Sequence, residues 1–170
     1  MKTNKPSLLA VTGFYVAADA AFMPTQMDTD AGYFISKEPV LRFNAFEVSE
    51  LAEALRKSLF KPNEVIAAEH MPPKDLVMSP HLHVSTQQDL ERKTVFVSVV
   101  RLDTGFRIES QPRKADGTWD RKADRDIDCY LPLDTSYEKL AETVIAYLRS
   151  RRDLPGQAID INQQRTARGA

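Results

Sequence analysis

The chain has few of the residues on which the chemistry of small proteins usually depends. Its single cysteine, Cys129, cannot form an internal disulfide, so no oxidising compartment is implied. None of its six glycines belongs to a glycine-rich run before a helix, which excludes a phosphate-binding loop of the usual pattern. Its three histidines form no His-Glu-x-x-His motif, and paired cysteines are missing as well.

Neither sign of charge predominates, and long apolar runs are missing. There are 23 Lys and Arg residues against 24 Asp and Glu residues, a net charge of -1. A general nucleic-acid binder needs clustered positive charge, so we expect no direct nucleic-acid partner. The first apolar run, Leu8–Val11, is broken by Thr12 and Gly13, and no window is as long as a membrane span. We therefore expect a cytoplasmic protein with no signal peptide and no membrane partner.

What remains is the composition of an ordinary globular domain. The 170 residues are 42% hydrophobic and 28% charged, which is enough to bury a core without metal or disulfides. We predict one domain over residues 1–156, followed by a polar C-terminal tail at residues 157–170.

The N-terminal half contains one clear helix among less certain elements. Leu8–Val16 is apolar and predicts a strand, whereas residues 17–32 read as a loop. A helix is expected from Ser49, as its cap, to Pro62, which stops it. Short elements complete the prediction: strands at Tyr33–Ile35 and Val40–Phe46 around Pro39, a strand or turn at Val65–Ala68, and a helical turn at Ser85–Arg92.

The C-terminal half has stronger patterns. Thr94–Leu102 is rich in β-branched residues, and Phe106–Ser110 and Asp126–Leu131 alternate between apolar and polar residues. These three segments predict an antiparallel meander. A helix from about Ser136 to Arg151 follows, with a capping box formed by Thr135 and Glu138 and an apolar stripe that includes Leu140, Val144 and Leu148. The sequence thus predicts an α+β fold, an antiparallel sheet with helices packed against it.

The histidines are the first candidates for chemistry. His81 and His83 are two apart, so a strand would place both on one face, where His70 and Asp75 could join them around zinc. A metal site needs three or four converging ligands, and the competing interpretation is a polar loop beside Pro80. We favour that interpretation and expect no metal and no cofactor.

The remaining residues do not form a recognisable catalytic site. Cys129 shares a strand face with Ile127 and Leu131, which predicts a core position and not a nucleophile. The carboxylates between Asp116 and Asp128 alternate with basic residues, as in a solvated hairpin connection. We therefore expect no catalytic residue and no enzymatic activity.

One stretch carries a local charge. From Asp28 to Glu53 there are six acidic residues and two basic ones, a local charge of -4. Ordinary acidity at a helix start next to a polar loop explains this pattern. The functional alternative is an acidic face that binds a basic protein partner through Asp28, Asp30, Glu47, Glu50 and Glu53.

A family resemblance covers residues 84–150. The residues that carry it are, in order, the lead-in Val84–Lys93, the strand Thr94–Arg101, Gly105-Phe106, a strand ending near Gln111, Asp116-Gly117-Thr118-Trp119, Ile127, Leu131-Pro132-Leu133-Asp134 and a helix from Ser136. This order resembles one family of immunity proteins of bacterial contact-dependent growth inhibition systems. The N-terminal half matches that family in general plan.

The resemblance implies a cytoplasmic protein that binds and blocks the toxic C-terminal domain of a cognate secreted effector, often a nuclease. It carries over no individual contact residue. Two other functions remain open from the sequence, a small metal-dependent hydrolase that uses the histidine-containing loop, and an adaptor subunit of a larger assembly. The sequence identifies neither the toxin nor the oligomeric state.

Overall fold

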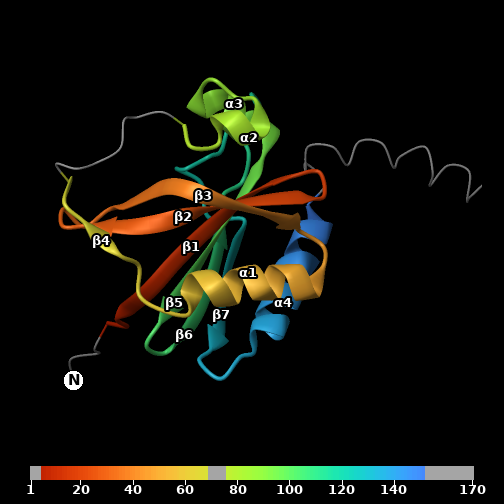
Figure 1. Cartoon of the computed structure of the whole chain (residues 1–170). Coiled ribbons are helices and arrows are strands. Elements are labelled where there is room, and N and C mark those ends of the chain that lie inside the picture. Colours follow the sequence, from red (N-terminus) through yellow and green to blue (C-terminus); the bar gives the residue numbers. More distant parts are fainter. Residues whose placement is uncertain (1–4, 69–75, 152–170) are drawn as a thin grey trace, which may run out of the picture.

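A single seven-stranded sheet organises the molecule (Figure 1). The structure is a computed structural model that describes residues 5–68 and 76–151. Its elements in chain order are β1 (Leu8–Ala17), β2 (Ala20–Thr29), β3 (Phe34–Asn44), α1 (Val48–Leu59), β4 (Val65–Ile66), α2 (Ser79–Leu82), α3 (Gln87–Lys93), β5 (Val95–Leu102), β6 (Gly105–Ser110), β7 (Ile127–Pro132) and α4 (Tyr137–Ser150).

The strands follow the order β3-β2-β1-β5-β6-β7, with antiparallel neighbours, and the short β4 pairs with β2 in parallel. This arrangement confirms the predicted α+β class, with an antiparallel sheet and helices packed against it. The predicted meander is β5-β6-β7, and each of its strands lies within one residue of its expected ends. The predicted boundary at residue 156 and the tail at residues 157–170 lie outside the described residues.

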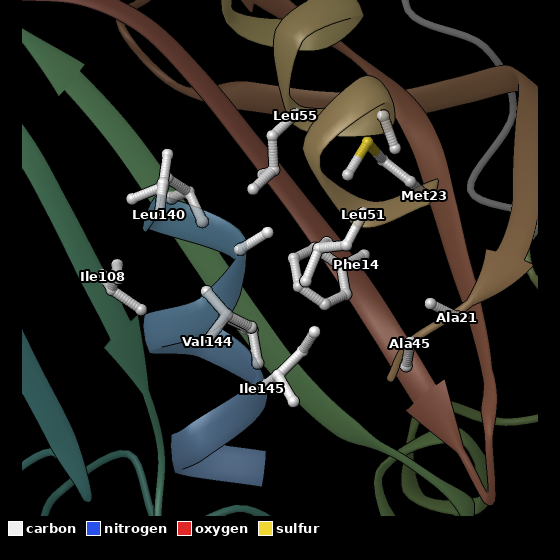
Figure 2. Packing of buried hydrophobic residues seen from close by; sticks show 14 of the residues in the cluster. Phe14, Ala21, Met23, Ala45, Leu51, Leu55, Ile108, Leu140, Val144 and Ile145 are labelled. Carbon is white, nitrogen blue, oxygen red and sulfur yellow. The ribbon is translucent and has the colours of Figure 1, made fainter. Parts of the chain in front are cut away.

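The main core lies between the sheet and the pair α1 and α4, which pack side by side on one face (Figure 1). Figure 2 shows Leu51 and Leu55 of α1 facing Phe14 of β1, with Leu140 and Val144 of α4 beside them. All five side chains are fully buried. The predicted stripe on α4 is therefore confirmed as core.

A smaller cluster lies on the opposite face of the sheet. Phe22 of β2 packs there with Met78, Val84 and Leu90 from the α2–α3 region. Phe22 alternates with Ala21 and Met23, which belong to the main core, and successive side chains of a strand point to opposite faces. The two layers of helices therefore cover different faces of one sheet.

The prediction of a loop over residues 17–32 is wrong, because β2 occupies most of it. Ala17 pairs with Ala20, so β1 and β2 are joined by the two-residue turn Ala18-Asp19. Ala18 takes a positive φ of 54°, a conformation usually reserved for Gly or Asn, so the turn carries no obvious sequence signal.

The two short strands expected around Pro39 are one strand, β3. Val40 pairs with Pro24 and Lys37 pairs with Thr25, so Glu38 and Pro39 bulge out of the ladder. A proline is tolerated there because β3 is an edge strand and the bulge needs no amide donor.

Both predicted helix caps are displaced. The residue before α1 is Glu47, whose side chain makes no cap hydrogen bond, so Ser49 lies inside the helix. At α4, Ser136 replaces Thr135 as the cap, and its hydroxyl accepts a hydrogen bond from the Lys139 amide at 3.1 Å. Periodicity fixes the apolar face of a helix, whereas neighbouring polar residues compete for its first position.

Candidate functional site

The structure separates the histidines that the sequence placed together. His81 lies in α2, and its Nε2 is 2.7 Å from a carboxylate oxygen of Glu38. His83 ends α2 in a left-handed conformation with φ 52°, so the two do not share a strand face. His70 and Asp75 lie outside the described residues. Within residues 5–68 and 76–151, no three His, Cys, Asp or Glu side chains gather as metal ligands.

Cys129 occupies the position that its strand pattern predicts. It is half-buried on β7 and packs against the main core together with Ile127 and Leu131. A thiol in this place fills space between the sheet and the helices.

The five predicted partner-binding carboxylates fall into two groups. Asp28 and Asp30 lie at the far end of β2, where an Asp30 carboxylate oxygen accepts from the Ala68 amide at 2.9 Å. Glu47 directly precedes α1, and Glu50 and Glu53 lie in its first half, next to the start of β2. The length of β2 separates the groups, about 30 Å at the usual rise per residue.

The α1 carboxylates already have partners within the protein. Glu50 accepts a hydrogen bond from the Asn44 amide at 2.7 Å, which ties the helix start to β3. Glu53 forms ion pairs with Arg56 at 2.7 Å and Lys57 at 3.6 Å, and the hydrogen bond from Arg56 lowers its pKa. The negative charge of Glu53 is therefore balanced within α1 itself, whereas Glu50 has a neutral partner.

A groove runs between α1 and the edge strand β3, and we call it the α1–β3 groove. It consists of two adjoining clefts that share Leu41 and Lys57. The smaller cleft, about 250 Å³, is lined by Glu50 and Glu53. The larger, about 460 Å³, extends past the end of α1. Arg42 and Lys57 balance the two glutamates of the smaller cleft. The larger cleft has Lys37, Lys57 and Lys61 against Glu38 and Glu64, so its net charge is +1.

The larger cleft opens where β1 and β2 separate. The two strands pair at three positions beside their hairpin and then diverge (Figure 1). Asn63 bridges the gap: its Nδ2 donates to the carbonyl oxygens of Val11 at 2.8 Å and Gln26 at 3.0 Å, and its Oδ1 accepts from the Val11 amide at 2.7 Å. One side chain therefore fixes the width of the opening.

Three lysines line this larger cleft, and sequence reasoning did not single them out. Lys37 comes from β3, Lys57 from α1 and Lys61 from the segment after α1. Lys57 and Lys61 are four residues apart, a spacing that places two side chains on one side of a helix. That spacing was the signal by which the sequence could have grouped Lys57 with Lys61. The position of Lys37 beside them could not be predicted, because it depends on how β3 packs under α1.

The floor of the larger cleft contains an unusual hydroxyl. Thr12 of β1 is 1% exposed, and its Oγ1 has no hydrogen-bond partner among the described residues. Buried polar atoms are nearly always hydrogen-bonded, because removing one from water without a partner destabilises the fold. Thr12 thus lies beneath the lining of the larger cleft with an unpartnered hydroxyl whose oxygen is closed to solvent.

No helix in the described parts of the chain is long and apolar enough to cross a membrane. No protein-family model matches the chain, and no curated protein sequence matches it significantly.

Solved structures share its fold. A protein of unknown function from Neisseria meningitidis has a TM-score of 0.59 at 16% identity, over 89% of this chain and 100% of that chain. One chain of a CdiA-CT/CdiI toxin and immunity complex from Yersinia pseudotuberculosis has a TM-score of 0.60 at 11% identity, over 86% of this chain and 98% of that chain. At such identities, the likeness shows the fold.

Proposed function

We propose that this protein is an immunity protein that binds and neutralises the C-terminal toxin domain of a contact-dependent growth inhibition effector. The observation that carries the proposal is the fold shared with nearly the whole of one chain of a toxin and immunity complex. The resemblance of residues 84–150 to one immunity family supports it independently. The protein then acts by occupying the toxin, as a stoichiometric binder in the cytoplasm and not as an enzyme.

The surface chemistry is compatible with a protein partner. The α1–β3 groove offers charges of both signs beside apolar side chains, a mixture that suits protein interfaces. If the toxin is a nuclease, it must attract phosphates, so its own active-site cleft is basic. The carboxylates Glu47, Glu50 and Glu53 give such a toxin an acidic surface to approach.

The direct test is protection of living cells. The tagged protein is used to capture a partner from its native cell, and the C-terminal domain of that partner is then expressed from an inducible promoter in a laboratory bacterium. We expect growth arrest without this protein and normal growth with it. Death despite soluble co-expression would rule out the immunity function for that pair.

The same preparation separates the alternatives. An adaptor would retain several subunits in place of one toxin domain. A metal-dependent hydrolase would contain stoichiometric zinc after purification without added metal. For an immunity protein, His81→Ala and His83→Ala leave folding and toxin binding nearly unchanged, because neither side chain lines the groove and His81 reaches it only through a partly exposed ion pair with Glu38.

The acidic surface predicts a kinetic effect. Exposed charges mainly steer diffusional encounter, so reversing Glu47 and Glu50 to lysine should slow association with a basic toxin by about 3- to 10-fold at low salt. Stopped-flow or surface-based kinetics measures this rate, with Glu142→Lys on the exposed side of α4 as the matched control. An unchanged association rate at low salt would show that this acidic surface does not face the toxin.

A further inference from the structure

The basic cleft requires an explanation that the acidic surface does not provide. Lys37, Lys57 and Lys61 reach it from three separate segments. Lys57 has a long ion pair with Glu53, at 3.6 Å, and both side chains are half-exposed or more. Lys37 and Lys61 form no ion pair with a residue in the described parts of the chain. Glu38 and Glu64 also line the cleft, but among the described residues Glu38 pairs with His81 and neither glutamate pairs with one of the three lysines. Three lysines against two glutamates leave the lining with a net charge of +1.

Its shape favours an inserted group over a flat contact. The volume of about 460 Å³ is large enough for one or two side chains, and Met23, Pro24 and Met27 supply apolar walls. Because Asn63 ties β1 to β2, the opening is already formed before anything binds. A preformed cleft lowers the ordering cost of binding.

The three lysines specify the chemistry of the occupant. Their ammonium groups are donors with no acceptor capacity at all. A negatively charged occupant that is rich in acceptors matches them. A carboxylate has that chemistry and can accept several hydrogen bonds at once.

We infer that this cleft receives one or more acidic side chains of the partner, held by Lys37, Lys57 and Lys61. The inference rests on the proposed function for the identity of the partner, which is the toxin domain. The groove then recognises the arrangement of charges on the toxin: carboxylates of the toxin enter at the end of α1, and its basic residues approach Glu50 near the start of α1. Such a pattern fixes the orientation of the bound toxin as well as its affinity.

The first test uses the double variant Lys37→Glu and Lys61→Glu, with Lys139→Glu on the exposed side of α4 as the control. Against the captured toxin domain, we expect the double variant to bind about 100-fold more weakly at low salt, with a smaller loss at high salt, and the control to bind within about 2-fold of wild type. Melting temperatures check that both variants fold.

Charge-swap rescue decides between recognition and simple repulsion. Each Asp and Glu of the toxin domain is reversed to lysine in turn, and at least one reversal should restore binding of the double variant. Wild-type affinity for the double variant overturns the inference, and so does a loss that no reversal rescues. Failure of the proposed function is distinguishable, because then the wild-type protein itself neither binds nor protects.

A second test needs no toxin. A tetraglutamate peptide added to the isotope-labelled free protein should shift amide resonances around Thr12, Lys37 and Lys61, whereas a tetralysine peptide should not. The shifts should vanish in the double variant. Shifts that are absent from the cleft, or that persist in the double variant, contradict the inference. Thr12→Val should raise the melting temperature, because it removes the unpartnered hydroxyl, and should leave the peptide response unchanged, because that hydroxyl is closed to solvent.

Discussion

Gly13 lies directly beneath the ring of Phe96, on the face of the sheet opposite α1 and α4. A Cβ at this position would be 2.3 Å from Cζ of that ring. The ring cannot easily move, because Tyr15 and Trp119 flank it with ring centroids at 4.9 Å and 5.6 Å. The absence of a side chain on β1 therefore makes room for an aromatic stack that joins the sheet to the segment before β7.

Gly13→Ala should accordingly destabilise the fold by about 1–3 kcal/mol, the usual range for overpacking. Chemical denaturation measures the change in unfolding free energy. Phe96→Leu removes the clash, so the double variant should be more stable than the sum of the two single effects predicts. Strict additivity would show that the ring and the glycine are not coupled.

Glu91 is a second residue whose environment predicts a measurable effect. It is 3% exposed, and its carboxylate accepts hydrogen bonds from the Trp119 amide at 3.0 Å, from Gln87 at 3.2 Å and from Arg121. Burial alone raises the pKa of Glu91, but these hydrogen bonds outweigh burial and hold the pKa below its ordinary value. The carboxylate thus ties α3 to the segment that contains Trp119.

This shift sets the sign of a pH dependence. Because the pKa is lower in the folded chain than in the unfolded chain, the stabilisation is complete above the unfolded pKa of about 4.3 and is lost as the pH falls through the folded pKa. Glu91→Gln should lower the unfolding free energy at neutral pH by about 1–3 kcal/mol. The difference between wild type and variant should shrink below about pH 4, and a constant difference down to about pH 2 would contradict this account.

At the scale of elements, α4 shows which contacts hold the sheet and helices together. Leu140 is fully buried among α1, α4 and the sheet (Figure 2). Leu140→Ala should cost about 2–5 kcal/mol, which includes the cavity that remains. Leu133→Ala is the matched control, because Leu133 is 47% exposed and its truncation should cost less than about 0.5 kcal/mol. Equal melting temperatures for the two variants would show that this face of α4 is not core.

The elements also show how far the sequence could predict the fold. The β5-β6-β7 meander and α4 were predictable because alternation and helical periodicity are local signals. The strand β2 was not, because its alanines, Pro24 and Asp28 have weak strand preference and its turn has no glycine. Its place in the sheet is decided by pairing with β3 over nine positions, which is a long-range effect.

At the scale of the whole molecule, the candidate site depends on contacts that no local pattern contains. Asn63 lies 52 residues from Val11 in sequence yet hydrogen-bonds to its backbone. The acidic residues could be identified from composition, but their division into two groups and the three lysines beside them follow from the way β1 and β2 separate. Of the five predicted carboxylates, only Glu50 and Glu53 line the groove, and their role in binding remains a prediction.

Under the proposed function, this protein acts by binding the toxin domain stoichiometrically. An immunity protein must leave almost no free toxin, because even a slow toxin turns over repeatedly. We therefore expect a dissociation constant of about 1 nM or below, equivalent to about -12 kcal/mol. An interface of standard size, about 1,600 Å², is sufficient when it contains a few well-packed anchors.

Titration of the toxin with this protein tests that claim most directly. The purified toxin domain is held at a concentration far above the expected dissociation constant. Its activity is measured while this protein is added stepwise. The account predicts a linear fall that reaches zero when one molecule has been added for each toxin domain. Loss of activity at a small fraction of that amount would indicate catalytic inactivation, and undiminished activity beyond it would indicate that this protein does not neutralise the toxin.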